Sequence, residues 1–332
     1  MNVLKDRIFA FCLVCLFSFG ATGHSQDLLF PDFKTSMLRE TSDRAAYAER
    51  QALYDSANSK FVKIFEENYR NNIHEFQNEE SSCYRIPPIV HQIWLGSKVP
   101  EKYRAWMESW MEIRGWKYML WTDEEVRNFP MQNRDLFELS ENWGEKSDIL
   151  RLEILFKYGG VYVDTDFECI RPECFEKLHK GFDFYVGFEP LEHGFIGKFN
   201  MFKMCNALIG AIPGHPLIKD LVENMRANFL AYRRHAGPIG TTGPGYLTRI
   251  ICEYVENRMD RYRNMYFPTT FFYPFSAIDI EKFNPDSPCS FPIFLETLGI
   301  HYWNMSWVKK EQDNEYHGKP CNFPYLELKN EI

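Results

Sequence analysis

Two aspartates stand two positions apart in Asp164-Thr165-Asp166, directly after the apolar run Val161-Tyr-Val163. In an extended segment, residues two apart point to the same side of the backbone. The two carboxylates should therefore converge at the tip of a strand, and such hard oxygen ligands suit Mg²⁺ or Mn²⁺. A divalent ion held in this way could stabilise the negative charge that grows on a leaving diphosphate. Short Asp-x-Asp matches are also common in turns and caps, so the spacing alone leaves a structural role open.

The segment before these aspartates predicts how they are positioned. Residues from Glu145 to Tyr158 show a strong helical pattern, and Gly159-Gly160 ends that helix and turns the chain into the strand. Asp148 and Arg151 lie three apart on one face of this helix. The pair is either an ordinary surface ion pair or part of the lining of a pocket in front of the two aspartates.

Two stretches of this region resemble the signature of a known family. Ser147-Asp-Ile-Leu-Arg151 and Tyr158-Gly-Gly-Val-Tyr-Val-Asp-Thr-Asp166 are similar to the sugar transferases that contain the Asp-x-Asp (DXD) motif. These are glycosyltransferase family 32 and its relatives, which include fungal α-mannosyltransferases, α-1,4 glycosyltransferases and, more distantly, the clostridial glucosylating toxins. The resemblance covers about residues 84 to 308. Its supporting matches are Ile86–Gly96, Pro213–Pro216, Thr242–Pro244 and His301–Trp307.

The resemblance implies an α/β fold of the GT-A type, a Rossmann-like, mostly parallel sheet flanked by helices. It also implies retaining transfer of a sugar from a UDP- or GDP-sugar, with Mn²⁺ or Mg²⁺ as the cofactor. Retention without an obvious nucleophilic carboxylate implies attack from the face of the leaving diphosphate. The acceptor would be a glycan, a lipid or a protein.

Carried over by position, the resemblance assigns roles to individual residues. Asp164, Asp166 and Arg151 would be the catalytic residues, and a ring nitrogen of His301 would join Asp164 and Asp166 as a metal ligand. Three of the expected donor contacts have equally simple structural alternatives: a core aromatic for Trp94, plain packing for Tyr162 and a loop cap for Asn206. The donor-binding residues would be Trp94, Asp148, Arg151, Tyr162, Asp164, Asn206, Ser306 and Trp307.

Independently of that resemblance, the first half of the main domain alternates strands with helices, which is typical of an α/β domain with a mostly parallel sheet. The second half is more irregular, and its stretch from Phe267 to Phe294, rich in Pro and Phe, predicts a packed loop region. The predicted strands are Ile86–Leu95, Trp116–Trp121, Val161–Asp164, Asp183–Phe188 and Asn200–Met204. The predicted helices are Lys102–Ile113, one that begins at the Thr122/Glu125 capping box, Glu145–Tyr158 and Pro216–Tyr232.

The N-terminus predicts targeting. Lys5 and Arg7 precede the apolar run from Ile8 to Phe19, and small residues follow it. This run is too short for a comfortable membrane span, which needs about 20 residues. Residues 1–23 are therefore expected to be a signal peptide, or alternatively an uncleaved signal anchor that attaches the protein to a membrane. Either reading predicts an exported or membrane-associated protein of the secretory pathway, the periplasm or the medium. Residues 24–82 predict a helical segment, either a stalk or a bundle packed on the main domain, and residues 83–325 the catalytic domain.

Several classes of function are excluded or less favoured. The net charge of -8 argues against nucleic-acid binding. A P-loop, a G-x-G-x-x-G turn after the first strand and a serine nucleophile elbow are all missing from the sequence. Two rivals remain: a glycoside hydrolase, which needs two carboxylates flanking a sugar, and a non-catalytic protein that binds a sugar or nucleotide on a degenerate transferase fold.

Overall fold

The computed structural model describes residues 30–39, 43–234, 236–258, 261–281 and 293–304. Its centre is a six-stranded sheet in the order β2–β1–β3–β8–β5–β9. Every strand runs parallel to the others except β8, which is antiparallel to both of its neighbours. The strands are β1 (Ile89–Ile93), β2 (Lys117–Trp121), β3 (Gly160–Val163), β5 (Phe184–Phe188), β8 (Met204–Ala211) and β9 (Asn264–Phe267).

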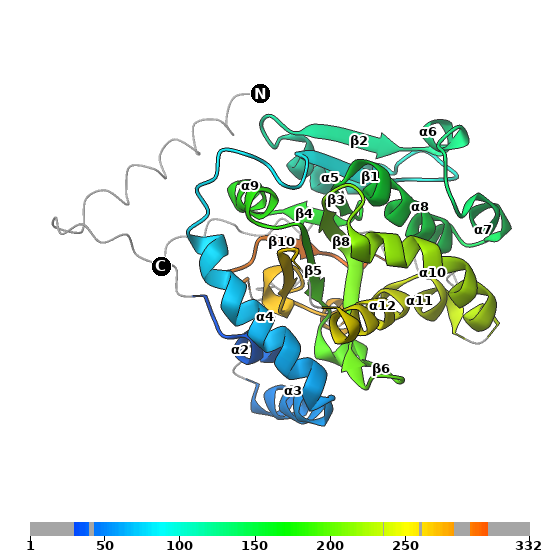
Figure 1. The fold of residues 1–332 in the computed structure, drawn as a ribbon. Coiled ribbons are helices and arrows are strands. Elements are labelled where there is room, and N and C mark those ends of the chain that lie inside the picture. The colour runs from blue at the N-terminus through cyan, green and yellow to red at the C-terminus, as the bar shows by residue number, and fades with distance from the viewer. Residues whose placement is uncertain (1–29, 40–42, 235, 259–260, 282–292, 305–332) are drawn as a thin grey trace.

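Helices cover both faces of this sheet, so the expected α/β fold with a mostly parallel sheet is confirmed. α8 and α12 pack on the central strands, and α4 packs against β9. Figure 1 shows α8, α10 and α12 on one side of the strands and α4 and α9 on the other. The helices are α2 (Phe33–Leu38), α3 (Arg44–Ser56), α4 (Ser59–Gln77), α5 (Arg104–Met111), α6 (Asp123–Arg127), α7 (Arg134–Leu139), α8 (Trp143–Tyr158), α9 (Pro172–Gly181), α10 (Pro216–Tyr232), α11 (Gly237–Thr241), α12 (Pro244–Asn257) and α13 (Ala277–Glu281), with single 3-10 turns η1 (Glu101–Tyr103), η2 (Leu191–His193) and η3 (Thr269–Phe271).

The strand directions decide where polar residues gather. The carboxyl ends of the five parallel strands meet at one edge of the sheet, and the reversed strand β8 brings its amino end to the same edge. A small ribbon lies beside this edge, formed by β4 (Phe167–Cys169) and the antiparallel β10 (Gly299–His301). In that ribbon His301 is paired with Phe167, one residue after Asp166. A second ribbon joins β6 (Phe195–Ile196) to β7 (Met201–Phe202).

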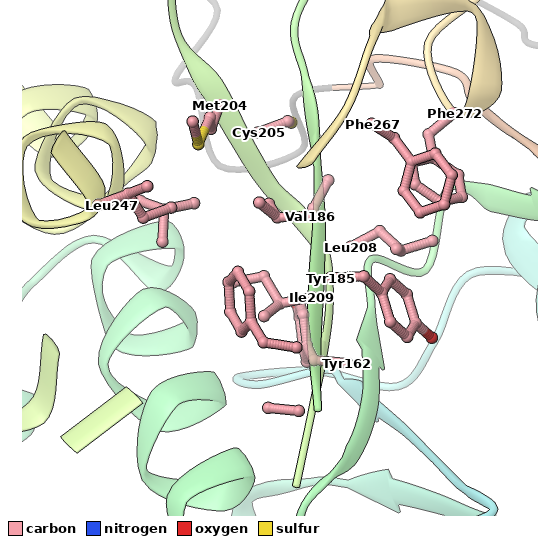
Figure 2. Close-up of a cluster of buried hydrophobic side chains, with 14 of the residues drawn as sticks. Tyr162, Tyr185, Val186, Met204, Cys205, Leu208, Ile209, Leu247, Phe267 and Phe272 are labelled. Atoms are coloured by element: carbon pink, nitrogen blue, oxygen red, sulfur yellow. The ribbon is translucent and has the colours of Figure 1, made fainter. Parts of the chain in front are cut away.

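The core forms on both faces of β5 and β8. Figure 2 shows Ile209 facing Leu247 of α12 on one face, while Leu208 and Tyr185 lie toward Phe267 and Phe272 on the other. Leu247 is 2% exposed, and the other five residues are fully buried: Tyr185, Leu208, Ile209, Phe267 and Phe272. Burial of this kind stabilises a fold by about 25 cal/mol per Å² of apolar surface removed from water. The sheet edge that carries the polar residues is therefore attached to a rigid interior.

The N-terminal helices α2, α3 and α4 pack on the main domain, which selects the bundle over the stalk. Phe65 of α4 makes edge contacts with Phe188 and Tyr266, at ring-centroid distances of 5.2 and 5.0 Å. The Arg39 side chain, which directly follows α2, forms ion pairs with Glu192 and Asp279 of the main domain. No helix within the described ranges is both long and apolar enough to cross a membrane. Residues 1–23, which carry the targeting prediction, lie outside those ranges.

Most predicted elements are confirmed, including the capping box at Thr122 and the whole of α10. The strand predicted at Asn200–Met204 is wrong. The chain forms only the two-residue β7 there, and the long strand β8 starts at Met204 and runs to Ala211. The stretch predicted as a packed loop contains η3 and α13, and residues 282–292 lie outside the described part. The five described cysteines, Cys83, Cys169, Cys174, Cys205 and Cys252, are all free thiols.

The glycine pair that links α8 to β3 is required by geometry. Gly159 and Gly160 both have positive φ, at 63° and 98°. A Cβ on Gly160 would lie 2.6 Å from the Ile89 carbonyl oxygen, which belongs to rigid backbone. We therefore expect Gly160→Ala to destabilise the protein by about 2 kcal/mol or more, because strain at positive φ adds to the clash. Urea unfolding measures this loss, and a midpoint equal to that of the unmodified protein would contradict the packing described here.

A buried histidine should make stability depend on pH. His91 on β1 accepts a hydrogen bond at Nδ1 from Trp121 Nε1–H (3.1 Å), so its proton is on Nε2 and points at the Gly159 carbonyl (2.9 Å). Burial lowers its pKa from 6.5 to about 4.

Below pH 6.5 the unfolded chain therefore binds a proton at His91 that the folded chain does not, and stability falls as the pH drops toward 4. The total loss from this residue is about 3 kcal/mol. Denaturant unfolding at pH 7.5, 6 and 5 measures it, with His91→Gln as the comparison. The slope of stability against pH should be shallower in the variant, and an equal slope would exclude His91 as its source.

Candidate active site

A cavity of about 620 Å³ opens at the polar edge of the sheet. Its size is within the range of small-molecule sites, roughly 300–1,000 Å³. Its walls come from the ends of β1, β3 and β5, the start of β8, the first turns of α8, and β10. Six of the residues predicted to bind a donor, Trp94, Asp148, Arg151, Tyr162, Asp164 and Asn206, line this one cavity, together with Asp166 and His301. Ser306 and Trp307 lie outside the described residues.

Three potential metal ligands converge at the floor of the cavity. One ligand atom from each of Asp164, Asp166 and His301 lies within 4.8 Å of the other two. His301 Nε2 is 3.2 Å from Asp166 Oδ1 and 3.8 Å from Asp164 Oδ2. Two carboxylate oxygens and one imidazole nitrogen suit a divalent ion such as Mn²⁺, which accepts both kinds of donor. The residues present therefore fit the cofactor that the motif implies.

Each carboxylate is anchored through one oxygen and leaves the other facing that shared point. Asp164 Oδ1 accepts a hydrogen bond from the Tyr162 hydroxyl (2.6 Å), while its Oδ2 faces His301. Asp166 Oδ2 accepts from the Asn304 backbone N–H (2.6 Å), while its Oδ1 faces His301. Anchoring of this kind fixes the direction of the ligand oxygens before any ion binds.

The electrostatics agree with a cation site. Burial and the neighbouring Asp166 charge raise the pKa of Asp164, although Arg151 opposes them. Burial alone would also raise the pKa of Asp166, but the contact with His301 lowers it below its usual value. Burial would lower the pKa of His301, and the Asp166 carboxylate outweighs that effect and raises it. A positive charge on this point is thus favoured by both carboxylates, which otherwise repel each other.

A second cluster stands beside the first and is centred on Arg151. Its guanidinium forms ion pairs with Asp148 Oδ1 (3.0 Å) and Asp164 Oδ1 (3.3 Å) and donates to the Asn206 carbonyl oxygen (2.6 Å). Its Nε–H and one further N–H are directed at Ser147 O and Oγ. All three guanidinium nitrogens of Arg151 therefore have protein partners, through three hydrogen bonds and two ion pairs. Arg151 thus holds α8, β3 and β8 in register around the cavity.

Asp148 completes this cluster. Its Oδ1 accepts from Asn206 Nδ2 and its Oδ2 from Thr242 Oγ1, both at 2.8 Å. Burial raises its pKa to about 6, against the charge of Arg151. The DXD segment, the helix before it and the Thr242–Pro244 match are therefore joined in space, although they are up to 94 residues apart along the chain.

Two of the predicted donor contacts are aromatic and also line the cavity. Trp94 is half-buried, lines the cavity and packs on Tyr103 at a ring-centroid distance of 4.8 Å. The Tyr162 ring centroid lies 4.3 Å from the Arg151 guanidinium. Tyr162 is only 1% exposed, so its side chain mainly contacts other protein groups. Trp94 is thus the more accessible of the two predicted aromatic contacts.

One supporting match of the family resemblance lies away from the cavity. His215, in the Pro213–Pro216 match, caps the amino end of α10 and bonds to Asn264, and it does not line the cavity. The sequence analysis assigned no role to Thr242, Glu189, His193 or Lys203, which the structure places at the cavity or in the cluster beside it. Glu189 could have been found, because it directly follows the predicted strand 183–188, whose carboxyl end must lie at the same edge as that of β3.

Comparison with known proteins agrees with this geometry. Residues 98–181 match the family described as "Glycosyltransferase sugar-binding region containing DXD motif". Inositol phosphoceramide mannosyltransferase 3 of Schizosaccharomyces pombe is 29% identical over 185 residues, which are 53% of this chain and 47% of the relative. Mannosyl phosphorylinositol ceramide synthase SUR1 of Saccharomyces cerevisiae is 30% identical over 185 residues, 53% of this chain and 44% of the relative.

Among solved structures, PaToxG glycosyltransferase superposes with a TM-score of 0.36 and 16% sequence identity, over 62% of this chain and 78% of the other. The chain spans about half the length of the curated relatives it matches. The match over residues 98–181 contains every residue of the DXD segment and of α8. This chain is therefore related to the glycosyltransferases whose sugar-binding region contains the DXD motif.

Proposed function

We propose that this protein is a metal-dependent, retaining glycosyltransferase that moves a sugar from a UDP- or GDP-sugar to a hydroxyl group. The observation that carries the proposal is the convergence of Asp164, Asp166 and His301 within 4.8 Å on the floor of the 620 Å³ cavity. When bound there, Mn²⁺ or Mg²⁺ supplies positive charge for the diphosphate that leaves the sugar.

Different residues of the cavity would contact the base, the diphosphate and the sugar of the donor. Trp94, at the end of β1, offers an aromatic face for the base. Asp164 and Asp166, at the end of β3, stand where the diphosphate would lie. Asn206, at the start of β8, and the Arg151–Asp148 cluster of α8 stand on the side of the sugar. Ser306 and Trp307, outside the described residues, remain expected contacts of the diphosphate.

The relatives suggest which donor to test first. Two of them are named as enzymes that attach mannose to an inositol phosphoceramide, so a GDP-mannose donor and a lipid acceptor head the candidates. Glycan and protein acceptors stay open for this chain. The proposal of an exported or membrane-associated location depends on residues 1–23 alone.

The test is a panel of UDP- and GDP-sugars incubated with the full chain and Mn²⁺, with release of free nucleoside diphosphate as the readout. Slow hydrolysis of one donor is expected even without an acceptor, because water can replace the acceptor hydroxyl. Removal of the metal with a chelator should abolish it, and added Mn²⁺ should restore it. A glycoside hydrolase would instead cleave glycosides and tolerate the chelator. Absence of both donor turnover and nucleoside diphosphate binding would defeat the proposal.

A further inference from the structure

The cavity contains one carboxylate that the proposed roles leave unused. Glu189 follows β5 directly, lines the cavity and has a side chain that is 5% exposed. Its Oε2 is 3.1 Å from His193 Nδ1 and 3.8 Å from the ammonium of Lys203. Within the described ranges, its Oε1 accepts no hydrogen bond.

The group that holds Glu189 is itself fixed. His193 Nε2 accepts a hydrogen bond from the Ala277 backbone N–H (3.1 Å), which places the ring proton on Nδ1, where it points at Glu189. The Glu189 backbone N–H donates to the Lys203 carbonyl oxygen (2.8 Å), and this bond ties the end of β5 to the start of β8. Burial would raise the pKa of Glu189, but the contacts with His193 and Lys203 lower it, so the group is an anion at neutral pH.

The other carboxylates of the cavity wall have oxygens that are either paired or buried out of reach. Asp148 receives Arg151, Asn206 and Thr242. Glu192 binds Arg39 and Arg50 through Oε1, and its Oε2, which has no hydrogen-bond partner among the described residues, is buried out of reach of a ligand. Beyond the two aspartates of the DXD motif, Glu189 is therefore the carboxylate of this wall that keeps an oxygen for a ligand, as far as the described residues extend.

The strand order places Glu189 relative to a bound donor. Trp94 follows β1, Asp164 follows β3 and Glu189 follows β5, and in the sheet these strands stand in the order β1–β3–β8–β5. Neighbouring strands are about 4.8 Å apart, so the ends of β3 and β5 are about 10 Å apart. A donor with its base near Trp94 and its diphosphate near Asp164 would extend its sugar toward Glu189. Trp303 contacts both the metal-ligand cluster and the group that holds Glu189, because its ring centroid lies 4.3 Å from that of His301 and 4.5 Å from that of His193.

We propose that Glu189, positioned by His193 and Lys203, binds hydroxyl groups of the sugar that is transferred and so contributes to the choice of sugar. The inference rests on the proposed function and extends it. A carboxylate oxygen with no protein partner is a strong acceptor for a sugar O–H, since hydrogen bonds to charged groups are the strong ones. Glu189 would act in binding and selectivity, and no covalent bond to the sugar is involved.

The experiment compares the full-length protein with Glu189→Gln, which keeps the shape and the acceptor for His193 but loses the charge. With the nucleotide sugar found in the panel, the KM for donor hydrolysis should rise about tenfold or more. Calorimetric binding of the corresponding nucleoside diphosphate with Mn²⁺ should stay within twofold of the unmodified protein, because that ligand lacks the sugar. Preference between two donors that are epimeric at one hydroxyl should shrink in Glu189→Gln, a change that a purely structural role would not produce.

Glu253→Gln is the matched control, since Glu253 lies on the outer side of α12 in an exposed ion pair with Lys198. The Glu253→Gln variant should have the same donor KM and the same stability as the unmodified protein. An equal loss of nucleoside diphosphate binding in Glu189→Gln would overturn the inference, as would an unchanged donor KM and selectivity. A lost kcat at unchanged KM would instead place Glu189 in the chemical step, which also contradicts the inference. If the unmodified protein neither turns over a donor nor binds a nucleoside diphosphate, the proposed function itself fails.

Discussion

Replacement of Asp166 with asparagine is expected to lower donor turnover by about 10³-fold or more at saturating Mn²⁺. Asp166 supplies the ligand oxygen closest to His301. Because Asp166 is only 8% exposed, a carboxylate on the protein surface cannot reach this position and replace it as a ligand. A cation at this position contributes several kcal/mol of stabilisation to the departing charge, and each 1.36 kcal/mol is tenfold in rate. The measurement is release of nucleoside diphosphate as a function of Mn²⁺ concentration.

Folding should survive this change. The oxygen of the new side-chain amide can still accept from the Asn304 N–H, and the repulsion between two buried carboxylates disappears. The favourable contact between the Asp166 charge and His301 is lost as well, so the thermal midpoint should fall modestly while the protein stays folded. Asp135→Asn is the control, because Asp135 forms an exposed ion pair with Arg226 away from the cavity, and it should retain full activity. Turnover of the Asp166 variant near that of the control would remove the metal site from the mechanism.

The sequence predicted the half of the site that is local in the chain. Asp148, Arg151, Tyr162, Asp164 and Asp166 all lie within one helix, one glycine turn and one strand with the residues that directly follow it. Their relative positions follow from helical and extended periodicity together with the stop at Gly159-Gly160. The geometry of this half was therefore encoded in one short continuous segment, residues 148–166.

The other half depends on long-range pairing, which periodicity does not reveal. The reversed direction of β8 brings Asn206 to the same edge as Asp164, but nothing in the residues Met204–Ala211 distinguishes an antiparallel from a parallel strand. Thr242 reaches Asp148 only because Pro244 starts a helix, whereas the segment Gly243-Pro-Gly245 has the composition of a turn. His301 was assigned from the family resemblance, and its approach to Asp166 depends on the three-residue ribbon of β4 and β10.

Replacement of Arg151 with lysine should separate positioning from charge. Lysine keeps one positive charge between Asp148 and Asp164, so the two buried carboxylates stay compensated. Its three donors on a single nitrogen cannot reach Ser147, Asp148, Asp164 and the Asn206 carbonyl together, as the planar guanidinium does. We expect a loss of stability of about 2 kcal/mol and a roughly 10- to 100-fold weaker affinity for Mn²⁺, because Asp164 loses one of the contacts that orient it.

Arg151→Ala provides the opposite limit. It leaves Asp148 and Asp164 buried without a counter-charge, which costs about 3–5 kcal/mol, so much of this variant should be unfolded at room temperature. The lysine variant should stay folded, lose donor turnover by about 10²-fold at limiting Mn²⁺, and recover part of it when Mn²⁺ is raised. Recovery of that kind indicates that Arg151 acts by holding Asp164 in place. A lysine variant with unchanged Mn²⁺ affinity and a lowered kcat would instead indicate that the guanidinium contacts the donor directly.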